Sequence, residues 1–429
     1  MKHLYILLFV LPLIGLGQGW EQTFGGSELD VGRSVQQTTD GGYIIFGYSN
    51  NFGMGYPDFY LIKTYEDGEE EWFQIYEEGF NGYSVQQTTD GGYIIFGETY
   101  TFDGDNTFDF YLIKTDGIGE EEWSQDYGFS GIHDFGRSVQ QTTDGGYILC
   151  GTTKGVFDNN EWEDSEIYLI KTNDSGEEEW SQTFEGYGNG EEVQQTTDGG
   201  YIITGFCGNL NNRDVCIIKT DQNGDEQWSQ TFGGEEDDIG WSIQQTTDGG
   251  YIITGTTTSF GSGNDDVYLI KTDVNGDEEW SQTFGGIFPE GGYSVQQTLD
   301  GGYIITGVTT DENENRDVYL IKTYENGDEE WSQTFGKSSN NDLGYSVQQT
   351  LDEGYIITGY TQEGDTDVYL IKTDEQGNVT STIELPTPSS KRELIKTTNI
   401  LGQENTTIKN QPLIEIYDDG SAEKKIVLE

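Results

Sequence analysis

The sequence is poor in the residues on which enzyme chemistry most often depends. It has two histidines and three cysteines in 429 residues. Cys150, Cys207 and Cys216 have neither the spacing of a zinc site nor the number needed for a disulfide framework. A bridge between Cys207 and Cys216, which flank a short loop, and three buried free thiols are both open alternatives. His133 is the only histidine beyond the N-terminal segment, so His-dependent triads and His-rich zinc sites are nearly excluded.

Basic residues are also scarce. The chain has 20 Lys and Arg against 78 Asp and Glu, a formal net charge of −58. This charge opposes binding to nucleic acid and to anionic membrane surfaces, and it suits cations or neutral glycans better. An acidic surface also keeps a protein soluble in a salty medium, and we favour that role over a specific cation-binding role.

Long apolar runs are absent except at the N-terminus. A basic start precedes the apolar residues 4–14, and residues 15–17 supply small side chains at a cleavage site. This run is too short for a membrane-spanning helix, so residues 1–17 are predicted to be a signal peptide and the mature chain to begin near Gln18. We expect no transmembrane segment after its removal.

What the sequence has in excess is glycine and aromatic residues, with 61 Gly, 27 Tyr, 21 Phe and 9 Trp, a composition that favours strands and turns. They are arranged in repeats. A segment of the form T-x-D-G/E-G-Y occurs seven times at intervals of 50 to 54 residues. Its aspartates are Asp40, Asp90, Asp144, Asp198, Asp248, Asp300 and Asp352. Each unit reads as four strands, as residues 242–284 illustrate.

The turns and strands of one unit indicate the fold. The first two strands are joined through T-D-G-G and the last two through D-x-N-G-D, which predicts a type I′ turn. The middle strands are almost continuously apolar, as in a sheet covered on both faces. A repeat of about fifty residues built as one four-stranded meander is typical of a propeller blade, because a lone blade cannot bury both of its faces. The sequence therefore predicts an all-β, seven-bladed β-propeller.

One tryptophan recurs in the fourth strand of six units, where we expect it to pack one blade against the next. These residues are Trp72, Trp123, Trp180, Trp228, Trp280 and Trp331. The seventh unit has Ser381 at this position, whereas Trp20 begins the segment "WEQTF" with no preceding strands of its own. We therefore expect residues 20–24 to supply the fourth strand of the last blade and to close the ring.

Connection lengths predict where ligands bind. The turns after the first and third strands have constant length, but the distance from the Gly ending the second strand to the Lys of the third varies from 13 to 20 residues. The distance from the Trp to the next first strand varies from 12 to 15 residues. Both variable connections emerge on one face of a meander, and variable loops on a rigid scaffold commonly carry binding residues.

One residue per unit, directly before S-V-Q-Q, should ring the channel mouth on this face. Four aromatics, two arginines and one glutamate suit a glycan or peptide site, although they could also simply fill gaps between blades. The residues are Arg33, Tyr83, Arg137, Glu191, Trp241, Tyr293 and Tyr345. The longest variable loop, residues 152–166, adds Phe157 and Trp162, which either contact a ligand or fold back onto their own loop.

Two acidic loops resemble the first half of a calcium loop. Their candidate ligands are Asp103, Asp105, Asp109, Asp311, Asn313, Asn315 and Asp317. Both loops lack the later Gly and Glu of such a site, so we favour solvated loops, and calcium is the only cofactor they suggest. Carboxylates could serve a glycosidase or lyase, but no pair stands out and no phosphate-binding loop is present. We assign no catalytic residue and expect binding rather than catalysis.

The repeat W-S-Q-T-F-G-G … T-D-G-G-Y-I-I-T-G … D-V-Y-L-I-K-T-D-x-N-G-D-E-E-W resembles the blades of secreted bacterial β-propellers over residues 20–383. It is also similar to the tryptophan-docked blades of quinoprotein-type propellers, without recognisable quinone-binding residues. Similarity of fold alone implies no activity.

The C-terminal region has a second resemblance. After the "PTPSS" linker, "KRELIKTTNILGQE" and "PLIEIYDDGSAEKKIVLE" resemble the C-terminal sorting domain of the type IX secretion system. Composition changes here too, since residues 384–429 hold six basic and eight acidic side chains. The resemblance implies a small β domain that the type IX machinery reads. The expected domains are a signal peptide (1–17), the propeller (18–383), a linker (384–390) and the sorting domain (391–429).

These observations predict an exported binding or adhesion propeller, at the outer-membrane surface of a bacterium or in the medium. Its ligand would be a glycan or a protein held at the variable-loop face. Two alternatives are a carboxylate-dependent carbohydrate-active enzyme, a hydrolase or lyase, on the same scaffold, and a structural spacer at the cell surface. The expected partners are the type IX machinery and this extracellular ligand, and not nucleic acid.

Overall fold

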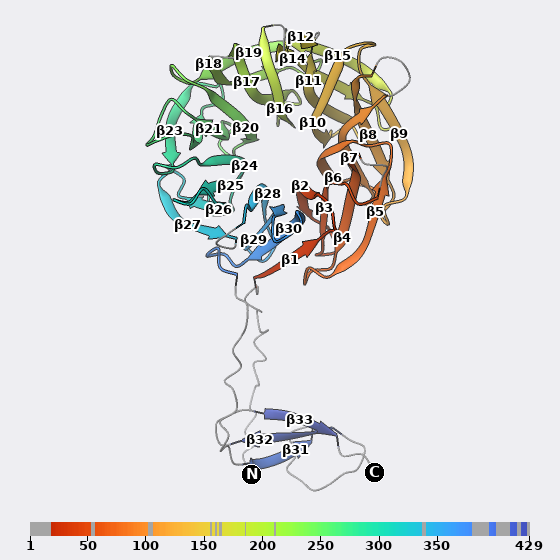
Figure 1. Cartoon of the computed structure of the whole chain (residues 1–429), viewed down its shortest axis with the longest axis vertical. Coiled ribbons are helices and arrows are strands. Elements are labelled where there is room, and N and C mark those ends of the chain that lie inside the picture. The colour runs from red at the N-terminus through yellow and green to blue at the C-terminus, as the bar shows by residue number, and fades with distance from the viewer. Residues whose placement is uncertain are drawn as a thin grey trace, which may run out of the picture. The chain divides into compact units, whose positions relative to one another are not determined.

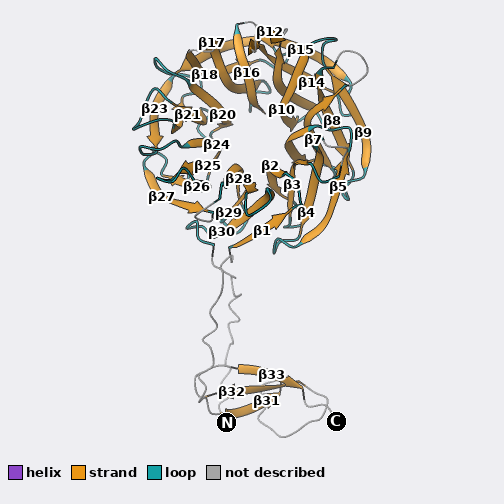
Figure 2. Cartoon of the chain, viewed as in Figure 1, coloured by secondary structure: helices purple, strands orange, loops and turns teal. Residues whose placement is uncertain are grey.

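The computed structural model describes residues 19–379, except 53–55, 102–105, 155–156, 159–160, 163–164, 185, 210–211 and 337–339, and three later strands between residues 394 and 426. All regular elements among these residues are strands (Figure 2). They therefore include no helix long and apolar enough to cross a membrane. The chain divides into two compact units, residues 1–379 and 380–429.

Seven four-stranded antiparallel sheets form a ring around a central channel, with the first strand of each sheet innermost (Figure 1). We number them as blades 1 to 7. Blade 1 contains β2 (Asp30–Gln37), β3 (Tyr43–Ser49), β4 (Asp58–Thr64) and β5 (Glu70–Tyr76). Blade 2 contains β6 (Asn81–Gln87), β7 (Tyr93–Tyr100), β8 (Phe108–Thr115) and β9 (Glu121–Tyr127). Blade 3 contains β10 (His133–Gln141), β11 (Tyr147–Lys154), β14 (Ser165–Thr172) and β15 (Glu178–Phe184).

The next three blades repeat this pattern. Blade 4 contains β16 (Tyr187–Gln195), β17 (Tyr201–Asn209), β18 (Asn212–Thr220) and β19 (Glu226–Phe232). Blade 5 contains β20 (Asp238–Gln245), β21 (Tyr251–Thr257), β22 (Asp266–Thr272) and β23 (Glu278–Phe284). Blade 6 contains β24 (Gly291–Gln297), β25 (Tyr303–Thr310), β26 (Arg316–Thr323) and β27 (Glu329–Phe335). The long loop of blade 3 carries a small hairpin of β12 (Phe157–Asp158) and β13 (Glu161–Trp162).

Blade 7 combines the two ends of the propeller. It contains β28 (Leu343–Gln349), β29 (Tyr355–Thr361), β30 (Asp367–Thr373) and, as its outer strand, β1 (Trp20–Phe24). β1 pairs antiparallel with β30 and places Trp20 opposite Lys372, the same register that places Trp72 opposite Lys63 in blade 1. The predicted seven-bladed propeller and its closure by residues 20–24 are both confirmed.

The recurring tryptophans pack one blade against the next, as predicted. The ring of Trp280 lies 5.9 Å from the ring of Tyr303 in the following blade. It also covers Gly327, where an added Cβ would lie 2.5 Å from the indole and where φ is +82°. Glycine is therefore required at this turn both for its conformation and for the close approach of the tryptophan.

The predicted type I′ turn is wrong. In the turn of blade 5, the Asp273 N–H donates to the Asp277 carbonyl and the Gly276 N–H donates to the Asp273 carbonyl, at 2.9 and 3.1 Å. Only Gly276 has positive φ, whereas a type I′ turn needs two such residues. The connection is a three-residue loop that ends in a left-handed glycine and a bulge. Glu353 takes the corresponding position in the first turn of blade 7, with φ of +68°.

The S-V-Q-Q segment joins neighbouring blades. Ser34 Oγ accepts a hydrogen bond from the Val85 N–H at 3.2 Å, and Gln36 Oε1 accepts one from the Gln87 N–H at 2.6 Å. The same contacts link blade 7 to blade 1 through Ser346 and Gln348. An innermost strand has no further strand to pair with, so these side chains satisfy N–H groups that the channel would otherwise leave free. This function explains why the segment recurs.

The aspartate of the D-G-G turn is also structural. Lys271 is 3% exposed, and its Nζ lies 2.9 Å from Asp248 Oδ2 and donates to the Thr272 carbonyl at 2.8 Å. Burial tends to raise the pKa of Asp248, but hydrogen bonds from Thr246 and Lys271 outweigh it and lower the pKa to about 2. Equivalent pairs occur in all seven blades. These carboxylates are therefore engaged in holding the turns.

The described strands of the second unit form one antiparallel sheet in the order β31 (Leu394–Asn399), β32 (Pro412–Tyr417) and β33 (Ala422–Ile426). They come from the two segments that resemble a sorting domain. In the propeller, Cys150, Cys207 and Cys216 are buried free thiols.

Candidate functional site: the channel mouth

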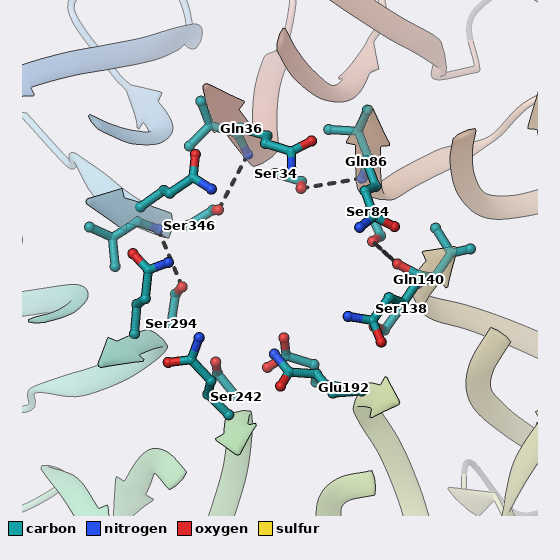
Figure 3. Close-up of a pocket in the computed structure, with 18 of the residues that line it drawn as sticks. Ser34, Gln36, Ser84, Gln86, Ser138, Gln140, Glu192, Ser242, Ser294 and Ser346 are labelled. Carbon is teal, nitrogen blue, oxygen red and sulfur yellow. Dashed lines mark hydrogen bonds between the residues drawn. The ribbon is translucent and has the colours of Figure 1, made fainter. Parts of the chain in front are cut away.

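The central channel is polar and narrow. Its cavity of about 210 Å³ is lined mainly by the serines and glutamines of the S-V-Q-Q segments (Figure 3). Glu192 of blade 4 takes the place of the serine, and its Oε2 accepts the hydrogen bond from the Ile243 N–H at 2.7 Å. Burial raises the pKa of Glu192 to about 7. The channel therefore carries a single acidic group among neutral ones.

Glu192 should make stability depend on pH. Folding raises the pKa of Glu192 from 4.5 to about 7, so the folded state binds a proton at this side chain more tightly than the unfolded state does. The free energy of unfolding should therefore fall as the pH rises through this range. Glu192→Ser restores the serine of the other blades and should raise the free energy of unfolding at pH 8 by about 1–3 kcal/mol. At pH 4 the variant and the parent should be nearly equal, which urea denaturation at both pH values would measure. An equal gain at both values would contradict this account.

The structure brings the seven sequence-predicted mouth residues together. They line one cavity of about 500 Å³, which we call the mouth cavity. These residues are Arg33, Tyr83, Arg137, Glu191, Trp241, Tyr293 and Tyr345. Each directly precedes a channel-lining position of an innermost strand, so the sevenfold repeat itself places them in a ring.

Four residues of the mouth cavity were missed from the sequence: Asn189, Phe206, Arg213 and Ile239. Phe206 and Arg213 lie on β17 and β18, on either side of a variable connection of blade 4. The rule that variable connections bind ligands pointed to this region. It did not indicate which of its side chains reach the channel.

Arg33 is a cation without a carboxylate partner. It forms no ion pair with any described residue, and its guanidinium lies 3.9 Å from the ring centre of Tyr345 and 5.6 Å from that of Tyr83. Its buried Nε has no hydrogen-bond partner among the described residues. Stacking on aromatic faces and hydrogen bonds with Tyr48 and Tyr345 stabilise this charge.

Two further arginines line the cavity. Arg137 Nη1 donates to Glu98 Oε1 at 2.6 Å, and its Nε lies 3.4 Å from Glu191 Oε2. Arg213 pairs with Asp237, and its Nε is also buried without a partner among the described residues. The sequence from 19 to 379 contains only four arginines, and three of them meet at this cavity. Arg137 and Arg213 are paired with carboxylates, so Arg33 supplies the positive charge that the described residues leave without one.

The other side of the mouth is aromatic. Trp241 meets Tyr293 edge to face at 5.9 Å, and Tyr293 lies 5.6 Å from Tyr345. Trp241 Nε1 donates to Thr256 Oγ1 at 3.2 Å, which fixes the indole. Burial raises the pKa of Tyr293 to about 12, so its hydroxyl keeps its proton at neutral pH. The cavity therefore combines flat apolar faces with hydroxyl and guanidinium donors.

The remaining candidates do not join this site. The side chains of Phe157 and Trp162 lie outside the described residues, as do Asp103 and Asp105. Asp311 Oδ1 accepts hydrogen bonds from the N–H groups of Asn313 and Asn315, at 2.7 and 3.0 Å, and so closes a hairpin turn.

The two other metal candidates belong to strands. Asp109 lies on β8 and Asp317 on β26, and burial together with the nearby Asp342 raises the pKa of Asp317. The described part of the chain contains no cluster of three or more His, Cys, Asp or Glu that could hold a metal ion.

No family model matches the chain, and no curated protein matches its sequence. Solved structures resemble it in fold. A protein of unknown function from Bacteroides caccae is 15% identical over 65% of this chain and 90% of its own, with a TM-score of 0.41. One from Dyadobacter fermentans is 9% identical over 82% and 97%, with a TM-score of 0.49. The WD40 domain of Pan2 from Neurospora crassa is 9% identical over 82% and 91%, with a TM-score of 0.48. These likenesses concern the fold alone.

Proposed function

We propose that this protein is an exported binding propeller whose mouth cavity holds a glycan that bears carboxylate or similar anionic groups. The net charge of the whole chain favours cations or neutral glycans, but the local charge at the mouth differs from it. A ligand drawn to the mouth would meet arginines on one side and aromatic rings on the other.

The observation that carries this proposal is Arg33. A guanidinium that forms no ion pair with any residue the structure describes, within a cavity of about 500 Å³, is suited to bind a carboxylate through two parallel hydrogen bonds. Trp241 and Tyr293 offer the rigid faces on which sugar rings pack. A cavity of this size accommodates two or three sugar units.

The test is calorimetric titration of the purified chain with matched neutral and uronate-bearing oligosaccharides. We expect the acidic series to bind more tightly, and Arg33→Met and Trp241→Ala each to weaken binding by about tenfold or more. Phe260→Ala removes an exposed ring that does not line the mouth cavity and serves as the control. Equal binding of neutral and acidic sugars, or no effect of Arg33→Met, would reject the proposal.

Chromatography of the sugars after each titration distinguishes the alternatives. Oligosaccharides recovered intact support binding, and shortened ones would indicate a carbohydrate-active enzyme on the same scaffold. Absence of binding by any glycan would favour the spacer.

Export is the second part of the proposal. It is supported by the signal-like residues 1–17 and by the sorting-domain resemblance of residues 391–429, whose segments supply β31, β32 and β33. Removing residues 391–429 in a bacterium with type IX machinery should keep the propeller inside the outer membrane. Surface labelling of whole cells would measure this, and unchanged labelling would refute the sorting role.

A further inference from the structure

A third cavity opens between blade 1 and blade 2, and we call it the lateral cleft. It has a volume of about 600 Å³. Its walls are formed on the side of blade 1 by Phe52 and residues 56–58, by residues 77–80 between β5 and β6, and by residues of blade 2 between Thr99 and Asp126. No residue of the mouth cavity lines it. It is therefore a separate site.

Aromatic rings form one wall of the lateral cleft. Phe80 lies between two tyrosines of this wall, with ring-centre distances of 6.1 Å to Tyr56 and 6.3 Å to Tyr100. Tyr56 is 53% exposed, although a folded protein normally covers a group of rings like this one.

The charged residues that line the cleft are all carboxylates, with no lysine or arginine among the described residues. They are Asp58, Glu77, Glu78 and Asp126. Asp58 is only 4% exposed, and its Oδ2 has no hydrogen-bond partner among the described residues. Burial and the nearby Glu77 raise the pKa of Asp58 to about 6. A buried carboxylate oxygen that accepts no hydrogen bond is costly unless a cation compensates it.

One lining residue of this cleft departs from the repeat. Phe80 stands four residues before the serine of S-V-Q-Q, where five other blades carry a carboxylate, namely Asp30, Asp134, Asp238, Glu290 and Asp342. Those carboxylates accept loop N–H groups, as Asp134 does from Phe129 at 2.7 Å and Asp238 does from Gly234 at 2.9 Å. In blade 2 an aromatic ring replaces the acid, and Phe80 and Asp58 line the same cleft.

We propose that the lateral cleft binds an alkylammonium group, such as a choline-like ion or the end of a lysine side chain. Aromatic faces attract cations of this kind, and the attraction grows where water is excluded. The four carboxylates also attract a cation through their negative charge. The volume of the cleft suits a small organic ion or one side chain. This site is independent of the proposed glycan at the mouth.

The test uses choline and its neutral isostere 3,3-dimethyl-1-butanol, titrated into the full chain and followed by NMR line broadening or calorimetry. We expect choline to bind and the isostere to bind at least about tenfold more weakly, because only choline carries charge. Asp58→Asn and Tyr56→Leu should each weaken choline binding by about fivefold or more. Tyr56 is exposed, so its variant should fold normally, which thermal denaturation would verify.

Trp241→Ala, at the mouth cavity, is the matched control and should leave choline binding unchanged. Acetyl-Gly-Lys-Gly-amide distinguishes the two sources of the cation, since tighter binding of the peptide supports a protein partner and tighter binding of choline supports a free small ion. Equal binding of choline and its isostere would overturn the proposal. So would unchanged choline binding in both cleft variants.

Discussion

Removal of residues 20–24 is expected to abolish the cooperative unfolding of the propeller and to cause the purified chain to aggregate. Without β1, the outer edge of β30 loses its backbone partner and offers itself to strands of other chains. Trp20 and Phe24 also leave the core cluster that they share with Val368 and Leu370. Loss of one docked tryptophan alone costs about 3–5 kcal/mol, a large part of the stability of a domain.

Urea denaturation followed by fluorescence, together with size-exclusion chromatography, would measure this loss. A matched control moves the strand rather than deleting it. In this variant residues 20–24 are absent and residues 379–385 are replaced by EEWSQTF, the sequence of β23. β30 then regains a fourth strand through a turn like those of the other blades, and a monomeric, cooperative protein should return. A deletion variant as stable as the parent would show that blade 7 does not need β1.

Replacing Arg137 with methionine should destabilise the propeller by about 3–5 kcal/mol, because it leaves Glu98 with an uncompensated charge. Glu98 is 2% exposed and lies 2.6 Å from the guanidinium, so water cannot take over the role of the arginine. The effect should appear as a lower urea midpoint with little change in slope.

The control is a double variant that combines Arg137→Met with Glu98→Gln. The double variant removes the closer of the two carboxylates that Arg137 contacts, although Glu191, at 3.4 Å, keeps its charge. It should therefore recover a large part of the lost stability. Arg33→Met removes an arginine that pairs with no carboxylate in the described part of the chain, and it should therefore cost much less than Arg137→Met. Equal losses for the two arginine variants, or no recovery in the double variant, would contradict a dominant role for the Arg137–Glu98 pair.

The ring and its closure could be predicted because their causes are local and repeated. The tryptophan that packs against a tyrosine of the next blade occurs at the same position of each fourth strand. A tryptophan at residue 20 and its absence at residue 381 were therefore sufficient to predict that the chain ends pair. The mouth residues were predictable for the same reason, since a position next to the innermost strand meets the channel in every blade.

Features that depend on single departures from the repeat were harder to predict. Arg213 and Phe206 reach the mouth cavity because of the path of one connection, which the repeat does not specify. The turn type was wrong because Asn-Gly is common to two hairpin classes, and only the bulge after Lys271 distinguishes them. One lining residue of the lateral cleft, Phe80, departs from the repeat, and its neighbours come from separate connections.

The pairing of β1 with β30 also has a consequence for biosynthesis. Trp20 reaches its place opposite Lys372 only when more than three hundred intervening residues have been made. The earliest strand therefore waits without a partner while the other blades assemble, and contacts between segments so far apart form slowly. A nascent or truncated chain that stops before β30 would carry an unpaired strand, which chaperones and proteases recognise. Pairing of β1 with β30 therefore takes place only in a chain that has been made through the last blade.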